Sequence, residues 1–324
     1  MILAIQACSL SLGSKKTVKE VSMPAWVLNP PVETSENIYG IGSGFTYNEA
    51  KEAALKDIAS KLIIEISSQS KSEVSQFNKN VSSSANQQIN TRTIETQLSD
   101  YKILQSEQVG SEIFMQIGMS RSGFIKKTSS RLKEIDDKIK IVMRELPRKT
   151  KLQQLISIQD IEPSIAKARR LVLLLQAAGS PNKTDKYLSY YNNVLKKSNS
   201  LLYNVRFNVS SDTNTKDFAK HLVALMSNKN ISASISNKAN ADVYINVKGV
   251  IKNSVMFSQN ISQLKVRIKI SDKRKRVISV KEYESSGSSP SSAASSVESA
   301  IKSMGEKFKN NGILESLGLV KNNV

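Results

Sequence analysis

The spacing of hydrophobic positions changes repeatedly along this chain, and each change predicts a new element. In the first half, two-residue and helical periods follow one another in the order β-α-β-β-β-α. The predicted elements are a strand at 38–44, a helix at 47–62, a half-exposed strand at 62–76, a hairpin at 101–109 and 112–119, and a helix at 122–146. Residues 77–98 are rich in Asn, Gln, Ser and Thr, which indicates a loose connection or a polar helix.

The first strand carries glycine at every second position, namely Gly40, Gly42 and Gly44. Alternate residues of a strand share one face, so these glycines leave that face bare for a close approach by a helix. The following helix is rich in alanine, which suits such an approach, and Thr46 with Glu49 forms the pattern of a capping box at its start. The spacing G-x-G-x-G does not fit a dinucleotide-binding fingerprint or a phosphate-binding loop.

The second half predicts a helical segment and then another mixed unit. Gly179-Ser180-Pro181 separates two amphipathic stretches, which indicates a helical hairpin over 147–200. Its apolar face would form either an internal core or an oligomer seam. Residues 201–324 follow the order β-α-β-β-β-β-α, with the Ser/Gly/Pro run at 285–292 as a linker or cap.

These patterns predict an α+β protein with two helix-on-antiparallel-sheet domains joined by a helical segment. The expected organisation is a signal and tether at 1–22, a first α+β domain at 23–146, a helical hairpin linker at 147–200, and a second α+β domain at 201–324.

The N-terminus predicts a lipid attachment site at Cys8. An apolar run ends in Ala7 directly before this cysteine, with the aliphatic Ile5 two residues earlier, which is the form of a bacterial lipobox. The run is short and no Lys or Arg precedes it, which a start codon placed too far downstream would explain. The alternative is a buried cysteine in an N-terminal strand. Ser9 follows Cys8 where an inner-membrane signal would have Asp, which favours the outer membrane.

Several of these segments together resemble the LPP-twenty lipoprotein family. The resemblance rests on Pro24-Ala25-Trp26-Val27, on the run Tyr39–Gly44, on the alanine-rich helix and on the hairpin at 101–120, and it covers roughly residues 20–130. The related N-terminal domain of the flagellar T protein of the basal-body rings is similar in the same way. The resemblance implies a non-enzymatic, periplasm-facing protein anchored in the outer membrane, and it transfers no functional residue other than Cys8.

The charge balance predicts an anionic partner. Lys and Arg number 47 against 28 Asp and Glu, a net charge of +19. Such a field favours acidic headgroups, lipopolysaccharide, peptidoglycan or nucleic acid. Four of the cations, Lys273, Arg274, Lys275 and Arg276, occupy a predicted hairpin turn, where they would either grip an anion or remain solvated. No aromatic residue interleaves with them, which argues against nucleic acid.

Catalytic chemistry finds little support in the composition. The chain has one cysteine and one histidine, which excludes an internal disulfide and the usual Cys/His zinc sites. His221 lies in a predicted helix without a nucleophile motif, so we expect a structural role. The carboxylate pairs, Asp136 with Asp137 and Glu49 with Glu52, lie among lysines and predict ion pairs. We therefore expect no enzyme, cofactor or metal site.

The leading hypothesis is a palmitate-carrying outer-membrane lipoprotein that binds or scaffolds components of the envelope or of a surface organelle such as a flagellum. The expected partners are peptidoglycan, lipopolysaccharide, other envelope proteins or further copies of itself. The alternative is a soluble basic protein that binds nucleic acid or another polyanion.

Overall fold

The computed structural model describes residues 22–73, 98, 100–180, 184–235 and 240–320. The chain divides into two compact units, and each is considered by itself. The first comprises residues 1–125 with 177–179, and the second comprises 126–176 with 180–324. The tether predicted at 1–22, Cys8 included, and almost all of the polar stretch 77–98 lie outside the described residues.

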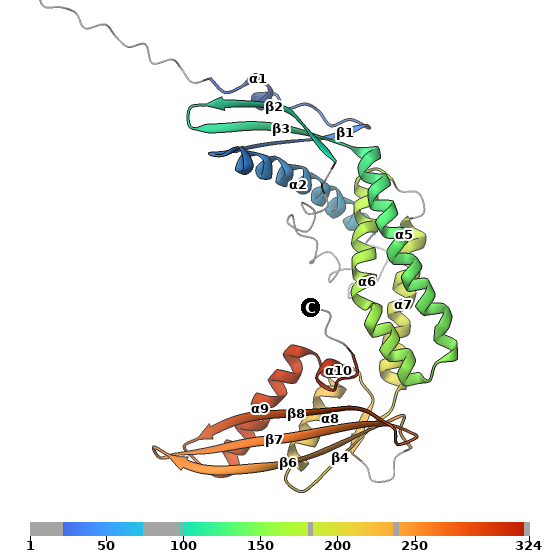
Figure 1. Ribbon diagram of the computed structural model, residues 1–324, viewed down its shortest axis with the longest axis vertical. Helices are drawn as coiled ribbons and strands as arrows, with labels where there is room; N and C mark the ends of the chain where they lie inside the picture. Colours follow the sequence, from blue (N-terminus) through green and yellow to red (C-terminus); the bar gives the residue numbers. More distant parts are fainter. Residues whose placement is uncertain (1–21, 74–97, 99, 181–183, 236–239, 321–324) are drawn as a thin grey trace, which may run out of the picture. The chain divides into compact units, whose positions relative to one another are not determined.

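The first unit is a three-stranded antiparallel sheet with one long helix across it (Figure 1). Its elements are α1 (Ala25–Leu28), β1 (Asn37–Gly44), α2 (Tyr47–Glu73), β2 (Tyr101–Val109), β3 (Glu112–Ser120) and the first turn of α5 (Arg121–Glu145). The strand order is β1-β3-β2, and α2 packs mainly against β1. The hairpin of β2 and β3 is therefore confirmed.

The glycine face of β1 receives α2, as the sequence predicts. A Cβ added at Gly40 or Gly42 would overlap the backbone of Ala54, and one at Gly44 would overlap Glu49 and Ala50. The capping box is confirmed as well. Thr46 Oγ1 accepts a hydrogen bond from the N–H of Glu49 at 3.2 Å, and Glu49 Oε2 accepts one from the N–H of Thr46 at 3.1 Å.

The strand predicted at 62–76 is wrong, because α2 continues to Glu73. Ile58, Leu62 and Ile66 are all buried, at a spacing of four residues, so the helical stripe extends past the predicted end. Ile64 is 67% exposed and lies off that stripe. Among its described residues, the first unit consequently has one strand fewer than the sequence pattern predicts.

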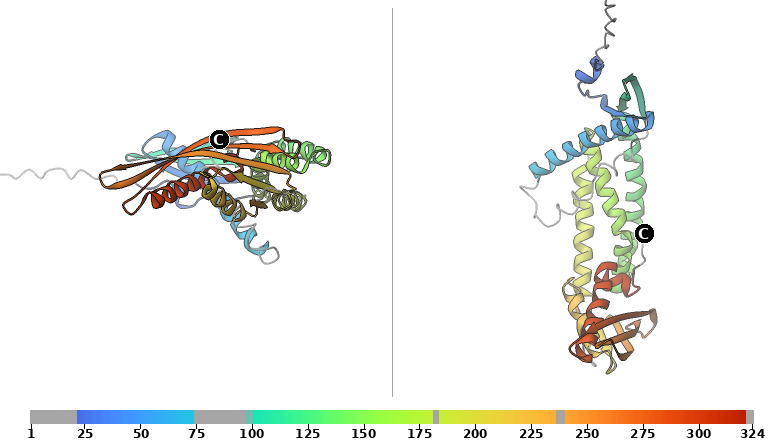
Figure 2. Two further views of the ribbon diagram at one scale, coloured as in Figure 1. Left: turned by 90° about the horizontal axis from the view of Figure 1, so that it is seen from below. Right: turned by 90° about the vertical axis from the view of Figure 1, so that its left-hand side faces the viewer.

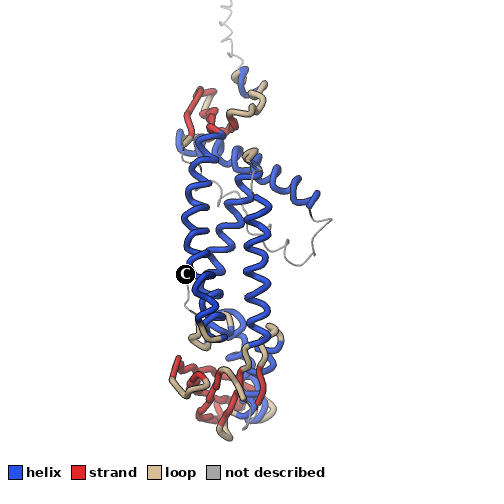
Figure 3. The backbone as a smooth tube through the Cα atoms, turned by 90° about the vertical axis from the view of Figure 1, so that its right-hand side faces the viewer, coloured by secondary structure: helices blue, strands red, loops and turns tan. Residues whose placement is uncertain are grey.

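The second unit begins with three helices that run alongside one another (Figure 3). They are α5 from Lys126 onward, α6 (Lys151–Ala177) and α7 (Thr184–Asn204), with a short 3-10 turn η1 (Leu146–Arg148) after α5. The hairpin of α6 and α7 is confirmed, and Gln159 Nε2 donates a hydrogen bond to Ser198 Oγ across it at 2.8 Å.

A five-stranded sheet with two long helices follows. Its elements are β4 (Phe207–Ser211), α8 (Lys216–Ser227), β5 (Ala233–Ile235), β6 (Val243–Met256), β7 (Gln259–Asp272), β8 (Val277–Ser289), α9 (Ala293–Asn311) and α10 (Ile313–Ser316). Helices α8 and α9 lie on the same face of the sheet (Figure 2, left). The α+β class is thus confirmed in both units.

Two details of the second sheet differ from the prediction. The strand order is β5-β4-β6-β7-β8, and β4 runs parallel to both of its neighbours, so the sheet is mixed rather than antiparallel. Helix α8 forms the crossover that a parallel β4–β5 pair requires. The predicted linker at 285–292 is largely strand, because Gly287 and its small neighbours Ser285 and Ser289 are buried. A Cβ at Gly287 would overlap the backbone of α9, so β8 continues under that helix.

Candidate binding surface

The sheet face that α8 and α9 leave uncovered is lined by basic side chains. Along β7, buried apolar residues that face the helices alternate with exposed residues on the other side. The outward cations are Lys265, Arg267 and Lys269 on β7 and Lys248 and Lys252 on β6. Because alternate residues of paired strands share a face, all five lie on one surface, which we call the basic face.

Like charges meet across the strands of the basic face. The register places Lys248 directly opposite Arg267, an arrangement that destabilises a strand pair. Carboxylates of β8 offset part of the charge, with Lys265 Nζ 3.0 Å from Glu284 and Arg267 Nε 3.7 Å from Glu282. These side chains are all at least half exposed, so each pair contributes about 0–1 kcal/mol. The basic face keeps a positive excess that fold stability does not explain.

The four predicted cations, Lys273–Arg276, do form the turn between β7 and β8, which we call the basic turn. Asp272 organises it, because its carboxylate accepts hydrogen bonds from the N–H of Arg274 at 2.8 Å and of Arg276 at 3.0 Å. The Arg276 guanidinium also pairs with Asp272 at 2.7 Å. Desolvation raises the pKa of the Asp272 carboxyl, but the hydrogen bonds from Arg276 and Arg274 outweigh it and hold the pKa below its usual value. Lys273, Arg274 and Lys275 remain exposed.

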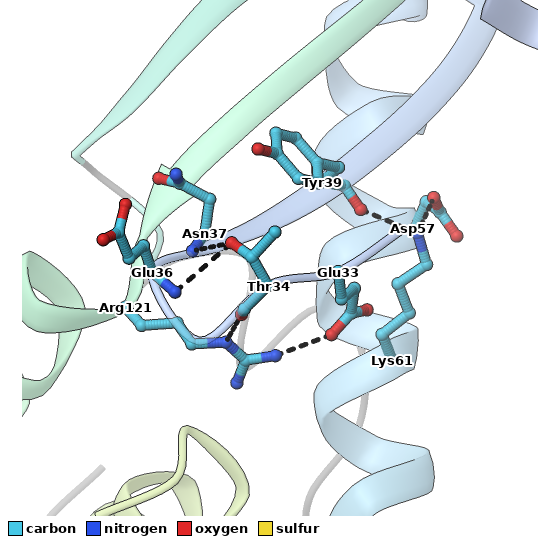
Figure 4. Close-up of polar contacts among 8 residues, drawn as sticks. All are labelled: Glu33, Thr34, Glu36, Asn37, Tyr39, Asp57, Lys61 and Arg121. Carbon is cyan, nitrogen blue, oxygen red and sulfur yellow. Dashed lines mark hydrogen bonds and ion pairs between the residues drawn. The ribbon is translucent and has the colours of Figure 1, made fainter. Parts of the chain in front are cut away.

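In the first unit, a polar cluster closes the free edge of β1 (Figure 4). Among the strands that the structure describes, β1 pairs only with β3, so the backbone groups of its other edge have no strand partner there. Asp57 Oδ2 accepts a hydrogen bond from the N–H of Ile41 at 3.0 Å, and Lys61 Nζ donates one to the carbonyl of Tyr39 at 2.7 Å. Asp57 and Lys61 also pair with each other at 2.9 Å. The two side chains take the place of a neighbouring strand and block pairing with another chain.

The same cluster fastens the segment that leads into β1 (Figure 4). Arg121 Nε donates a hydrogen bond to the carbonyl of Thr34 at 2.8 Å, and its Nη2 pairs with Glu33 at 2.7 Å. Thr34 Oγ1 in turn accepts hydrogen bonds from the N–H groups of Glu36 and Asn37. The polar groups of this cluster bond to one another and to backbone, so its role is to shape the domain.

Comparison with known proteins finds a family that the first unit is similar to. Residues 24–117 match the model of the LPP20 lipoprotein family. We call this matched region the LPP20 domain. The match lies inside the region, roughly 20–130, over which the sequence resembles the family, so the recognition is confirmed. The LPP20 domain comprises β1, α2, β2 and most of β3, and its glycine-lined contact between strand and helix is the packing described above.

One solved structure extends the likeness of fold beyond the LPP20 domain. The secreted protein HP1454 from Helicobacter pylori is 15% identical, covers 87% of this chain and 98% of its own, and superposes with a TM-score of 0.51, which shows a shared fold. A minor lipoprotein from Acinetobacter baumannii is 12% identical over 33% of this chain and 88% of its own, with a TM-score of 0.27. No curated protein matches the chain.

The remaining predicted sites have different outcomes. Cys8 lies upstream of the LPP20 domain and outside the described residues, so lipidation there stays a prediction. His221 lies on α8 against Gly305 of α9, where an added Cβ would meet the imidazole. Asp136 forms the expected ion pair, with Lys140 at 2.6 Å. Within the described ranges, no group of three or more His, Cys, Asp or Glu side chains could hold a metal ion. No helix among the described residues is long and apolar enough to cross a membrane.

The sequence patterns did not identify one surface of the second unit. In the structure, β6 runs to Met256 and β7 begins at Gln259. The two strands therefore form a long hairpin with Phe257 and Ser258 at its tip. Phe257 is 95% exposed. The available signal was the absence of any charged residue from 253 to 264 in a chain that is 23% charged.

Proposed function

We propose that this protein is a lipid-anchored lipoprotein of the bacterial outer membrane that acts by binding and scaffolding on the periplasmic side, without catalysis. The observation that carries the proposal is the LPP20 domain, which begins at residue 24, shortly after the lipobox-like Cys8. Several acyl chains on one cysteine bind a membrane firmly, whereas a single chain binds only marginally. The domains in this proposal work beside the membrane in the assembly of the envelope or of a surface organelle, such as a flagellum.

The basic face and the basic turn supply the binding role in this proposal. Lys248 opposite Arg267 costs stability in the sheet, and three cations of the turn are exposed. An anionic polymer of the envelope, such as lipopolysaccharide or peptidoglycan, would neutralise both groups. Anchoring raises the effective concentration of such a polymer around the domain, so modest intrinsic affinity suffices.

Metabolic labelling with palmitate tests the anchor. We expect wild-type protein, expressed in a bacterium from its natural gene, to carry label and to fractionate with the outer membrane. The Cys8→Ala variant should lose the label entirely and leave the membrane fraction, because no other cysteine exists in the sequence. Ser9→Ala is the matched control and should label like wild type. Equal label in the Cys8→Ala and wild-type proteins would refute lipidation at this residue.

Salt-dependent binding to purified lipopolysaccharide tests the polyanion role. Replacing Lys273, Arg274 and Lys275 by Ser should weaken binding and reduce the slope of log affinity against log salt by roughly two to three, since each lost phosphate contact removes about 0.9. The control replaces Lys216, Lys220 and Lys229, which are exposed in and just after α8, and changes the net charge equally. An equal loss in both variants would show that only overall charge matters and would contradict a site at the basic turn.

A further inference from the structure

One end of the C-terminal sheet carries no charge, in contrast to the basic turn at the other end of β7. Residues 253–264 and 285–297 contain no Asp, Glu, Lys or Arg. The two runs meet in space, because Asn260 of β7 pairs with Ser289 at the end of β8. In Figure 1 this end holds the tip of the β6–β7 hairpin. Lys252 and Lys265 are the first charges on either side of the hairpin run.

The tip itself is apolar and strongly exposed. Val255 is 70% exposed, Met256 is 53% exposed and Phe257 is 95% exposed. Phe257 and Ser258 form the two-residue turn with φ values of 48° and 58°. Turns of this kind are formed at least cost by Asn-Gly, whereas a bulky aromatic residue is rare at positive φ. The fold gains nothing from an exposed aromatic ring at this position, so the ring indicates a contact outside the chain.

The arrangement of the apolar groups favours a bilayer over a protein groove. Met256 shares a face with Lys252, Val255 lies on the opposite face, and Phe257 is at the end of the hairpin. Each face of the tip therefore exposes an apolar side chain beside the uncharged polar residues Ser258, Gln259 and Asn260, and a lipid phase surrounds an inserted element on every side. A groove on a partner would cover one face and leave the other apolar side chains in water.

The lysines complete the pattern of an interfacial membrane contact. Phe257 lies five positions after Lys252, which is about 16 Å of strand. The headgroup layer is roughly 5–8 Å thick in each leaflet, so the tip can enter it while the lysines stay in water. Lys252, Lys265 and the rest of the basic face would then lie near the headgroups, where anionic lipids attract them.

We propose that the β6–β7 tip, Val255, Met256 and Phe257, inserts into the headgroup region of an anionic lipid bilayer and docks the C-terminal domain on the membrane surface. This contact goes beyond the proposed function, because it needs no acyl chain on Cys8. A lipoprotein with this contact touches the membrane at two places, its tether and its C-terminal domain. In this proposal the tip binds lipid by insertion, whereas in the proposed function the basic turn binds an anionic envelope polymer through charge.

Vesicle binding by the full chain with Cys8→Ser, and therefore without acyl groups, tests the contact. The probe is a vesicle of equal parts phosphatidylglycerol and phosphatidylethanolamine, compared with pure phosphatidylcholine. We expect binding to the anionic vesicles, and a roughly tenfold to hundredfold loss in the Phe257→Ser variant, because one buried aromatic side chain is removed. Val32→Ser, at a residue of the first unit that is 84% exposed, is the control and should bind like its parent. Equal binding of the Phe257→Ser variant and the parent overturns the proposal, and so does the absence of vesicle binding.

A fluorescence readout distinguishes insertion from surface adsorption. The chain has one tryptophan, Trp26, so Phe257→Trp in a Trp26→Phe background reports on the tip alone. We expect the emission to shift to the blue when anionic vesicles are added, and brominated lipid to quench it. Unchanged emission at a lipid concentration that binds the protein would show that the tip stays in water, which overturns the proposal. Unchanged thermal unfolding of both variants without lipid ensures that the fold is intact.

Discussion

Replacing Gly42 by Val is expected to destabilise the LPP20 domain by about 3 kcal/mol or more. A Cβ at this position would overlap the backbone of Ala54 and the backbone and side chain of Ala53. Overpacking against flexible side chains typically costs about 1–3 kcal/mol, and α2 offers only backbone and alanine methyl groups, which cannot rotate away. The helix would have to leave β1, and with it the core formed by Ala54 and Ile58 would be lost.

Ser43→Val is the matched control for this change. Ser43 lies next to Gly42 on the same strand, is exposed and faces away from α2. Valine favours strands, so the control variant should retain the stability of the wild type or gain slightly. Hydrogen exchange measured by mass spectrometry separates the two units: the Gly42→Val variant should lose protection in β1, α2 and β3, with α6 to α9 unaffected. Equal protection in the two variants would disprove the packing argument.

Local signals account for the parts of the fold that were predictable. The bare face of Gly40 and Gly42 and the capping box at Thr46 depend on neighbours within a few residues, so the sequence alone shows them. The end of α2 does not follow from such local signals. Ile64 and Ile66 have the two-residue spacing of a strand, and only the burial of Ile58, Leu62 and Ile66 on one stripe favours the helix. Tertiary contacts therefore determine that this segment is helical.

The candidate surfaces show the same division. The basic turn consists of four adjacent cations, so the sequence alone showed its position. The strands on either side of it form the hairpin that the sequence predicts. The basic face depends on the pairing register that brings Lys248 opposite Arg267. The turn at Phe257 and Ser258 sets this register, and the sequence pattern did not reveal that turn. The tip at Phe257 was missed because a Phe-Ser turn at positive φ contradicts the usual hairpin signal.

Replacing Lys140 by Met should destabilise the helical part of the second unit by about 2 kcal/mol. Asp136 of α5 is 2% exposed, and its carboxylate has two partners, Lys140 at 2.6 Å and the hydroxyl of Tyr191, which donates a hydrogen bond at 3.0 Å. Removing one partner of a buried pair costs about 3–5 kcal/mol, and we discount this because Lys140 is half exposed. Lys138→Met is the control, because the pair of Lys138 with Glu134 on the same helix is more than two-thirds exposed and contributes about 0–1 kcal/mol.

The pH dependence of unfolding tests the cause of that loss. The hydrogen bond to Asp136 raises the pKa of the Lys140 ammonium, while burial, followed by Asp136, raises the pKa of the Tyr191 hydroxyl. Both groups are held protonated in the fold, so their contribution is complete below the unfolded pKa values of about 10 and is lost as the pH rises beyond them. Wild-type stability measured by urea unfolding should therefore fall above about pH 10, and the Lys140→Met variant should fall less steeply. Parallel curves for the two proteins would show that the ion pair with Asp136 does not stabilise the bundle.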